Sequence, residues 1–397
     1  MNHNFDNSKH TQAGILFLSI LTIVLYSSYM VWRIGHTINF TGGLNTVVSI
    51  LLLIIELRFF LVVLKDIILY VRLGDNKLSK DNVLTDKDQY KTAILIPTYK
   101  EDCNILIPTI TAAKSVKHAS SVWVLDDKDR DDVRKLASNM GVNYLSRSKP
   151  VNAKAGNVNN ALSEINADFV LIVNADHIVH PEILCKTVPF FENPKVAIVQ
   201  TPLAFYNVDS FEHTTTLKNG QIVYENLEDM FHRVIQPSRN RFGGAFFAGT
   251  NAVLRVSALK EIGGFATETS TEDYLTTLRL MQRGYQMRYV NEVLGLGLAA
   301  ENYDVYSTQR YRWVSGNGLS IIEEKFLING KMNILQKLLH YELLDRCVFL
   351  PLTKLVTFLL PFTFILLPIS EIVKADPVIF VTSNIFLFIL QILLFIT

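Results

Sequence analysis

Four apolar stretches, separated by sequence of ordinary polarity, constrain this chain more than any other feature. The first, 14–32, carries no charged residue, and as a helix it would extend about 28 Å, close to the thickness of a bilayer core. The second covers 46–64 and the fourth 378–396, whereas the third, 355–369, is shorter and contains two prolines. We therefore predict two transmembrane helices in 1–71 and two more in 351–397, embedded in a lipid bilayer.

The second stretch contains two ionisable residues, Glu56 and Arg58, near its middle. Charged side chains at that depth are costly in a bilayer, and they usually face protein or a water-filled cavity. Positions two apart on a helix do not face each other, so these two residues cannot neutralise one another. We predict that at least one of them pairs with another span or lines a wet path.

The positive charges near the apolar stretches indicate the orientation of the chain. Lys and Arg gather after the second stretch, between 65 and 91, whereas Arg33 is the only one of either kind in the short loop 33–43. By the positive-inside rule, the long stretch from about 72 to 350 lies in the cytoplasm. The first stretch is too long for a signal peptide and lacks a cleavage site, so we predict a multi-pass protein of the cell membrane.

Composition excludes other classes of protein. Charged residues make up 19% of the 397 positions, below the roughly 25% of soluble domains, and the net charge is +1. With no basic field we expect no nucleic-acid partner. Cys103, Cys185 and Cys347 match no zinc spacing or disulfide framework, and we expect them to be buried as small apolar side chains.

The central stretch alternates short apolar runs with helical patterns, which is typical of an α/β fold. Short, wholly apolar strands predict a parallel sheet covered on both faces, and such sheets bind ligands beyond the carboxyl ends of their strands. The predicted strands are 92–97, 121–125, 168–173 and 195–200, and helical patterns occupy 156–165 and 181–191.

Three of these strand ends carry acidic or amide side chains. Glu101 follows the first strand, Asp126 and Asp127 end the second, and Asn174 with Asp176 follows the third. Acidic groups gathered at one sheet edge repel each other unless a cation neutralises them, and hard oxygen ligands suit Mg²⁺ or Mn²⁺ shared with a diphosphate. One Asp after a strand is usually a turn residue, but three such sites on one edge favour a binding site.

Two further segments open predicted helices. Lys154, followed by small residues, suits an anion site or an ordinary helix start. Thr269 and Glu272 have the spacing of a capping box, which places Asp273 in the first helical turn. Asp273 there suits a general base and equally a structural acid at a helix N-terminus, so both interpretations stay open.

The segment 309–313 offers a third pattern. On a helix Gln309, Arg312 and Trp313 share one face. Amide, guanidinium and indole together suit a diphosphate beside a sugar ring. The alternative is a core tryptophan beside an arginine that reaches to the surface.

In this order and between these spans, the motifs resemble those of the processive family 2 glycosyltransferases, most closely the bacterial cellulose synthase catalytic subunit. The resemblance covers about 90–370. It rests on PTYKED at 97–102, LDD at 125–127, KAGNVNNAL at 154–162, ADH at 175–177, QTPLAFYN at 200–207, FFAGTNAVLR at 246–255, GGFATETSTED at 263–273 and QRYRW at 309–313.

The resemblance implies an α/β GT-A (Rossmann-like) cytoplasmic domain at 72–330, inserted between transmembrane α-helices, and an amphipathic interface helix at 331–350. It implies Asp273, with Glu272, as the catalytic site and Asp176 as the ligand of Mg²⁺ or Mn²⁺. Binding of a UDP-sugar donor is implied for Thr98, Tyr99, Glu101, Asp126, Asp127, Lys154, Asn174, Gln309 and Arg312. Binding of the glycan acceptor is implied for Trp313, Phe247, Gly249 and Thr250.

The chain departs from the family pattern at identifiable positions. Asn174 stands where the family's metal motif has Asp, which removes one charge beside the ion, and Ala248 replaces a Cys. The four predicted spans are fewer than the eight of cellulose synthase, so we expect a homo-oligomer or an accessory membrane subunit as a partner.

The expected function is that of a membrane-embedded inverting β-glycosyltransferase, a hexosyltransferase that moves a sugar from a UDP-sugar to the end of a growing polysaccharide. Glucose is the first candidate for the sugar. Two alternatives stay open. One is single addition to a lipid or short glycan, and the other is a catalytically weak nucleotide-sugar-binding subunit, because of Asn174.

Overall fold

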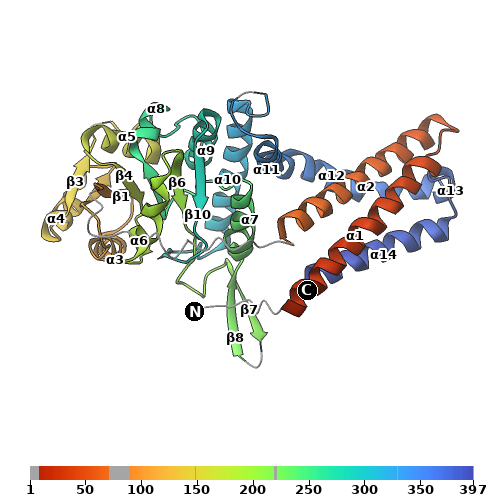
Figure 1. The fold of residues 1–397 in the computed structure, drawn as a ribbon, viewed down its shortest axis with the longest axis horizontal. Helices are drawn as coiled ribbons and strands as arrows, with labels where there is room; N and C mark the ends of the chain where they lie inside the picture. The colour runs from red at the N-terminus through yellow and green to blue at the C-terminus, as the bar shows by residue number, and fades with distance from the viewer. Residues whose placement is uncertain (1–8, 71–89, 148, 219–220, 329, 397) are drawn as a thin grey trace. The chain divides into compact units, whose positions relative to one another are not determined.

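The computed structural model describes residues 9–70, 90–147, 149–218, 221–328 and 330–396. The chain divides into two compact units (Figure 1). We call Met1–Leu73 with Val348–Thr397 the terminal unit, and Gly74–Cys347 the central unit. The central unit extends past the predicted boundary at 330.

The central unit is built around a seven-stranded mixed sheet in the order β10-β6-β9-β4-β1-β2-β3. Its strands are β1 (Thr92–Thr98), β2 (Ser121–Asp126), β3 (Asn143–Ser146), β4 (Phe169–Ile172), β6 (Val196–Gln200), β9 (Ala252–Arg255) and β10 (Gln286–Tyr289). The four predicted strands correspond to β1, β2, β4 and β6. The sheet is not wholly parallel as predicted, because β9 inserts antiparallel between β4 and β6.

Alternating side chains explain why these strands lie in the middle of the unit. Successive residues of a strand point to opposite faces, and both faces of this sheet are apolar. Leu95 and Ile172 belong to the core on one face, whereas Ile94 and Leu171 belong to the core on the other. The strands are therefore buried on both sides, and polar side chains gather at their ends.

Helices and short two-stranded pairs complete the central unit. The predicted helix at 156–165 is α5, whereas the segment 181–191 forms a short α6 followed by the 3₁₀ turn η1. The helices are α3 (Cys103–Lys114), α4 (Asp131–Asn139), α5 (Ala153–Glu164), α6 (Ile183–Thr187), η1 (Val188–Glu192), η2 (Phe231–Ile235), α7 (Gln236–Arg241), α8 (Val256–Glu261), α9 (Glu272–Arg283), α10 (Tyr303–Glu324) and α11 (Ile334–Leu344), and η3 spans Asp345–Phe349. β5 (Ile178–Val179) pairs with β11 (Gly295–Leu296), and β7 (His213–Lys218) pairs with β8 (Gln221–Asn226).

Helix α11 forms most of the segment predicted as an amphipathic interface helix. Ile334, Leu335 and Leu338 are exposed, whereas His340 and Glu342 are buried. One face thus packs within the central unit and the other is apolar and open. A position at a membrane interface remains a prediction.

The terminal unit consists of α1 (Lys9–His36), α2 (Gly43–Tyr70), α12 (Leu350–Leu366), α13 (Ile369–Ile372) and α14 (Pro377–Ile396). In the described part of the chain, three helices are long and apolar enough to cross a membrane, at Ala13–His36, Gly43–Leu69 and Pro377–Leu394. Helix α12 continues through Pro361 but has only 17 residues. The span predicted at the third apolar stretch, 355–369, therefore remains a prediction.

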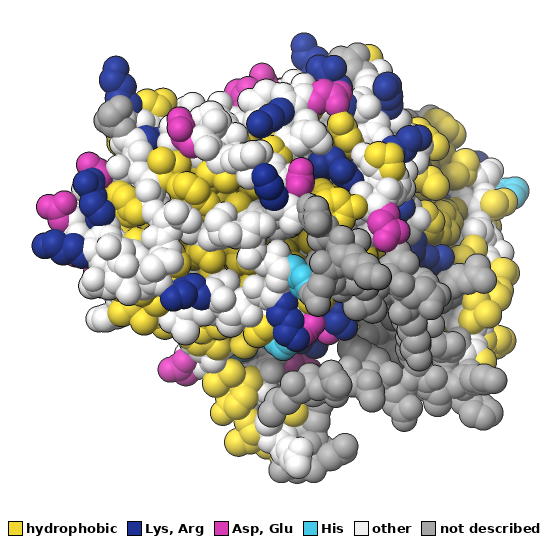
Figure 2. Space-filling model, turned by 60° about the vertical axis from the view of Figure 1, so that its left-hand side comes forward, with side chains coloured by type: hydrophobic (Ala, Val, Ile, Leu, Met, Phe, Trp, Pro, Cys, Tyr) yellow, Lys and Arg dark blue, Asp and Glu magenta, His cyan; other side chains and the backbone are white. Residues whose placement is uncertain are grey.

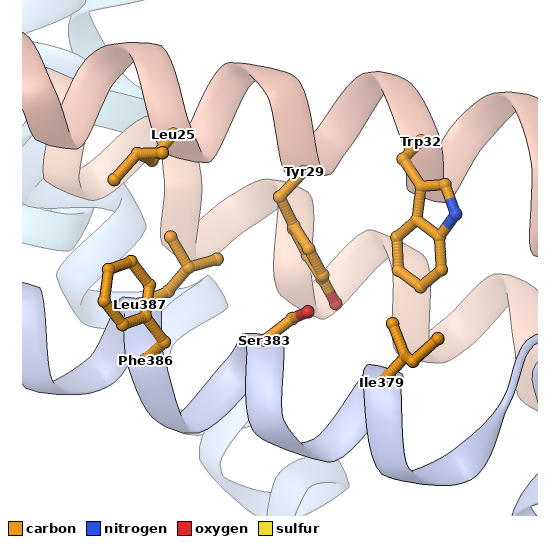
Figure 3. Close-up of a pocket in the computed structure, with 7 residues that line it drawn as sticks. All are labelled: Leu25, Tyr29, Trp32, Ile379, Ser383, Phe386 and Leu387. Carbon is orange, nitrogen blue, oxygen red and sulfur yellow. The ribbon is translucent and has the colours of Figure 1, made fainter.

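Glu56 pairs with another helix, as predicted. Its carboxylate lies 2.7 Å from Nε of Arg33 on α1, and Tyr29 donates a hydrogen bond of 3.1 Å to it. Nδ2 of Asn384 on α14 donates a hydrogen bond of 2.9 Å to the Tyr29 hydroxyl, so a third helix joins this polar cluster. Beside Tyr29, a cavity of about 250 Å³ lies between α1 and α14, lined by apolar side chains and Ser383 (Figure 3).

The surface and the cysteines bear on two composition-based predictions. On the face drawn in Figure 2, Lys and Arg side chains are dispersed among acidic, neutral and apolar ones. That distribution agrees with the small net charge. The three cysteines are free, as expected from the lack of a disulfide framework, but they are only partly buried rather than buried as predicted.

Candidate active site

The first group of predicted site residues lies where β1 ends. Glu101 accepts hydrogen bonds from Oγ1 of Thr98 (2.7 Å) and from the backbone N–H groups of Tyr99 (2.8 Å) and Lys100 (3.1 Å). Burial favours the neutral acid, but these bonds to the carboxylate outweigh it and lower the pKa of Glu101. Tyr99 remains 47% exposed, and the ammonium group of Lys128 lies 4.7 Å from its ring centroid.

Asp126 and Asp127 are neutralised by arginine side chains from the chain itself. Asp126 accepts from the backbone N–H of Arg130 (2.6 Å) and from its Nε (3.0 Å), and Nη2 of Arg130 donates to Thr98 (2.8 Å). Arg147 binds Asp127, with Nη2 at 2.9 Å. The cations that neutralise these two acids are therefore arginine side chains, whereas their predicted role in UDP-sugar binding remains a prediction. Sequence reasoning missed both arginines. The spacing of four between Asp126 and Arg130 could have indicated the first, whereas only the fold brings Arg147 to Asp127.

Arg147 also connects this edge to helix α5. The same Nη2 donates to the backbone carbonyl of Ala153 (2.8 Å), the first residue of α5. Asn152 before it adopts a left-handed conformation with φ 62°. Lys154 is thereby placed in the first turn of a helix tied to the end of β2.

Lys154 is the centre of the second group. Its ammonium donates 2.7 Å to Oδ1 of Asn174 and also donates to the carbonyl of Gly249. Burial lowers the pKa of Lys154, whereas the charges of Glu272, Asp273 and Asp176 act in the opposite direction. Residues from three separate parts of the chain thus lie within electrostatic reach of one ammonium group.

Asp273 occupies the first turn of α9. Helix α9 begins at Glu272 after Thr271, and Thr271 makes no side-chain cap, so the predicted capping box of Thr269 with Glu272 is wrong. One carboxylate oxygen of Asp273 accepts from the N–H of Tyr274 at 2.8 Å. Burial, and then the charge of Glu272, raise the pKa of Asp273 to about 7 although Lys154 opposes the shift. A carboxylate with such a pKa suits proton abstraction near neutral pH.

Gly249 brings the Phe246–Thr250 loop against these charges. Its φ is +86°, and a Cβ there would lie 3.0 Å from a carboxylate oxygen of Asp273 and 3.8 Å from Nζ of Lys154. The loop backbone can approach both groups only because this residue has no side chain. The position of Gly249 beside Asp273 is consistent with the predicted acceptor region.

Two other loop residues lie deeper than expected. Phe247 is 1% exposed and packs against Phe265, with ring centroids 6.0 Å apart. Its ring belongs to the core, so the structure does not support contact between that ring and an acceptor. Thr250 is also buried, and its Oγ1 accepts 3.0 Å from the backbone N–H of Asn174, which fixes the turn after β4.

Asp176 is held by its neighbour His177. Nδ1 of His177 lies 2.8 Å from Oδ1 of Asp176. Burial opposes ionisation of Asp176, but His177 and Lys154 outweigh it and lower the pKa of the carboxyl group. His177 fits only because position 297 is glycine, where a Cβ would lie 2.4 Å from the ring. The geometry therefore presents an ionised, oriented carboxylate.

Helix α10 carries the last group of predicted residues. Oε1 of Gln309 is buried and has no hydrogen-bond partner among the described residues. The carbonyl of Arg312 accepts 3.2 Å from Ser270, which joins α10 to the segment before α9. The charge of Arg312 also reaches Lys154. Arg312 therefore offers a cation beside Lys154, and Gln309 offers an unpartnered acceptor on the same helix.

Trp313 has a neighbour that sequence reasoning missed. The guanidinium of Arg310 lies 4.5 Å from the Trp313 ring centroid, and it also pairs with Glu228. The spacing of three between Arg310 and Trp313 could have indicated this contact. One face of the partly buried indole therefore packs on a cation within the chain.

The sequence and the fold are similar to known proteins. Residues 169–396 match the family described as Glycosyl transferase family group 2. The chain is 33% identical over 309 residues to the cellulose synthase catalytic subunit (UDP-forming) of Pseudomonas fluorescens, covering 76% of this chain and 41% of that protein. It is 31% identical over 316 residues to the cellulose synthase 1 catalytic subunit (UDP-forming) of Komagataeibacter xylinus, covering 78% and 41%. The chain thus spans about two fifths of the length of these relatives.

The fold resembles that of a mannosyltransferase from Pyrobaculum calidifontis in complex with GDP-mannose and Mn²⁺. The TM-score is 0.56 at 14% sequence identity, over 94% of this chain and 90% of the other. At this identity the similarity concerns the fold alone. Together with the family match it confirms the predicted GT-A fold.

Proposed function

Because this chain belongs to the glycosyl transferase family group 2, we propose that it is a UDP-sugar glycosyltransferase acting with inversion at the anomeric carbon. The observation that carries this proposal is the convergence of Asp273, Lys154 and the Gly249 backbone, since it joins a base of pKa about 7 to a partly buried cation. The UDP-forming activity in the names of the relatives supports a uridine diphosphate leaving group.

The proposed reaction is one displacement. An acceptor hydroxyl oxygen forms a bond to the anomeric carbon, the bond from that carbon to the diphosphate oxygen breaks, and UDP leaves with the bonding electrons. The hydroxyl proton passes to the carboxylate of Asp273. Lys154 and Arg312 stabilise the charge on the leaving diphosphate, and the unpartnered oxygen of Gln309 accepts from a donor or acceptor hydroxyl.

A divalent cation fits the residues at the end of β4. In the described ranges no three His, Cys, Asp or Glu side chains gather in a way that could hold a metal ion. Asp176 nevertheless offers an ionised carboxylate, and Mg²⁺ or Mn²⁺ commonly takes one or two carboxylates and completes its shell with phosphate oxygens and water. Asp176 would hold the ion, which would neutralise charge on the diphosphate. Asn174 is committed to Lys154 in this structure.

We further propose that the acceptor is a growing glycan, that glucose is the transferred sugar, and that the central unit is cytoplasmic in a multi-pass membrane protein. The names of the relatives support the first two points. The three apolar helices support a multi-pass membrane protein, and the Lys and Arg residues between 65 and 91 support a cytoplasmic central unit. A second copy or an accessory membrane subunit is the proposed partner. The contact of Asn174 with Lys154 favours one alternative, a nucleotide-sugar-binding subunit with weak activity.

The test is transfer by the full chain in membranes offered a panel of labelled UDP-sugars, with product sizing and digestion by linkage-specific hydrolases. Labelled product that grows with time and requires Asp273 supports the proposal, and products longer by one sugar identify single addition. UDP binding without any transfer at saturating Mg²⁺ or Mn²⁺ would favour the binding subunit.

The pH dependence of turnover should report Asp273. Its carboxyl group is protonated and inactive as a base below its pKa of about 7, so kcat should rise with pH through that value. Glu272→Gln should move the midpoint to lower pH, because the neighbouring negative charge that raises the pKa of Asp273 is removed. A pH–rate profile of both proteins checks this, and an unchanged midpoint in the variant would contradict it.

Gly249 and Gly263 form a matched pair of substitutions. Their φ values are +86° and +85°, but a Cβ at 263 has nothing within 4 Å, whereas one at 249 meets Asp273. Alanine at either position should therefore reduce the free energy of unfolding by about 1–2 kcal/mol. Only Gly249→Ala should also reduce kcat, by about tenfold or more. Equal turnover of the two variants would show that the contact with Asp273 is unimportant.

A further inference from the structure

Helix α11 contacts both parts of the proposed catalytic centre. On one side it reaches Tyr274, the residue directly after Asp273. On the other it packs against Gly243 and Gly244, which lead into the Phe246–Thr250 loop. The sequence analysis treated this segment only as an amphipathic interface helix and gave it no part in the site.

The contact with α9 is a buried hydrogen bond. The hydroxyl of Tyr274 lies 3.0 Å from Nδ1 of His340, and both side chains are within 1% of complete burial. Burial lowers the pKa of His340 well below its usual range, so the ring is neutral. The Nε2 atom of His340 is buried without a hydrogen-bond partner among the described residues. Within the described part of the chain, the only polar contact of the His340 ring is therefore with Tyr274, whose backbone N–H in turn donates to Asp273.

The contact with the loop uses the same helix. Nε2 of Gln336 donates 3.0 Å to the carbonyl of Gly243, and a Cβ on Gly244 would lie 2.5 Å from Leu339. Glu342 pairs with the buried Arg239 at 3.3 Å, and Nε of Arg239 donates 2.9 Å to the carbonyl of Gly244. The guanidinium also lies 5.3 Å from the ring centroid of Phe246.

We propose that His340 is a positioning residue that, through Tyr274, sets Asp273 against the Gly249 backbone while α11 holds the start of the loop. This proposal rests on the proposed function, because it assigns a role in that reaction. Removing either partner of the buried hydrogen bond between Tyr274 and His340 leaves the other without a partner, which costs free energy. A helix that packed here for stability alone could use an apolar side chain at 340, and the hydrogen bond instead fixes the angle at which α9 begins.

Three variants test the role. His340→Leu removes the hydrogen bond and leaves the buried Tyr274 hydroxyl without this partner, so the protein should fold with a modestly lower Tm. We expect kcat to fall about 10- to 100-fold with KM for the UDP-sugar nearly unchanged, because a displaced base acts after donor binding. His340→Asn, whose amide can occupy the place of Nδ1, should recover most of the loss. Leu338→Ala, on the exposed side of α11, is the matched control and should leave kcat as in the wild type.

A double-mutant cycle tests whether His340 acts through Tyr274. Tyr274→Phe should reproduce the loss seen in His340→Leu, and the double variant should be no worse than either, because one interaction is removed in all three. Normal kcat in a folded His340→Leu protein would overturn the proposal. So would additive losses of kcat in the double variant. A fall in kcat that only follows a fall in Tm, and that His340→Asn does not rescue, would overturn it as well.

Amide hydrogen exchange separates this proposal from the proposed function. His340→Leu should increase exchange in 246–250 and 272–276, and His340→Asn should not. A wild-type protein that binds UDP but transfers no sugar would refute the proposed function, yet the exchange pattern would still report whether His340 orders these two segments. Unchanged exchange in His340→Leu would overturn the positioning role.

Discussion

Asp273→Asn should reduce turnover about 10²–10⁴-fold while UDP binding stays close to that of the wild type. Asn keeps the shape of the side chain and can still accept from the N–H of Tyr274, so the first turn of α9 should remain intact. What is lost is the group that takes the acceptor proton. The measurement is kcat for labelled UDP-sugar in membranes, together with Kd for UDP and the Tm of the purified protein.

The adjacent acid supplies the control for that experiment. Glu272→Gln removes a charge from the same turn but leaves the proposed base, so near its own pH optimum it should retain far more activity than Asp273→Asn. Near-normal turnover of a folded Asp273→Asn enzyme would place the base elsewhere. Equal, severe losses in both variants would mean that the charge of the whole turn matters rather than one proton acceptor.

Asp176→Ala should abolish the dependence of activity on Mg²⁺ or Mn²⁺ and lower turnover about 10²-fold or more, because a bound cation is worth several kcal/mol to the leaving diphosphate. A metal titration at fixed donor concentration, with a chelator blank, measures this. The loss should appear in kcat as well as in the apparent metal affinity, since Asp176 is the ionised acid at this position.

Asn174→Asp is the informative companion. In this structure Oδ1 of Asn174 accepts from Lys154, and a carboxylate there would form an ion pair with it. Tighter metal binding in the variant would mean that position 174 can also face the ion. An unchanged titration would mean that Lys154 retains the new carboxylate. Full wild-type activity in excess chelator would remove the metal from the mechanism.

The elements that the sequence predicted well are those whose signal is contained in a few consecutive residues. The strands β1, β2, β4 and β6 read as unbroken apolar runs, and α5 as a helical pattern, because burial on both faces of a sheet requires that composition. Strand β9 has the same apolar character, but its antiparallel place between β4 and β6 depends on a connection longer than 50 residues. No local pattern specifies that neighbour.

In the candidate site, too, some features could be predicted from local sequence motifs and others could not. The motif resemblance assigned Lys154, Asp176 and Asp273 to one centre, and in the structure their charges lie within reach of one another. The partners of the other acidic residues at this sheet edge were not predicted. Arg130 and Arg147 neutralise the acids after β2, and Phe247 lies in the core although its neighbour Gly249 touches Asp273.

By itself, the sequence determined the apolar terminal helices, the buried strands, the acidic strand ends and the order of the motif residues along the chain, because each of these is a property of neighbouring residues. Only the tertiary structure decided which cation meets which acid, that Asn174 binds Lys154, and that His340 reaches Tyr274 across 66 positions. The physical reason is that burial and electrostatic pairing depend on distance in space. The pKa of Asp273 is raised by its desolvation in the folded protein, a condition that exists only after packing is complete.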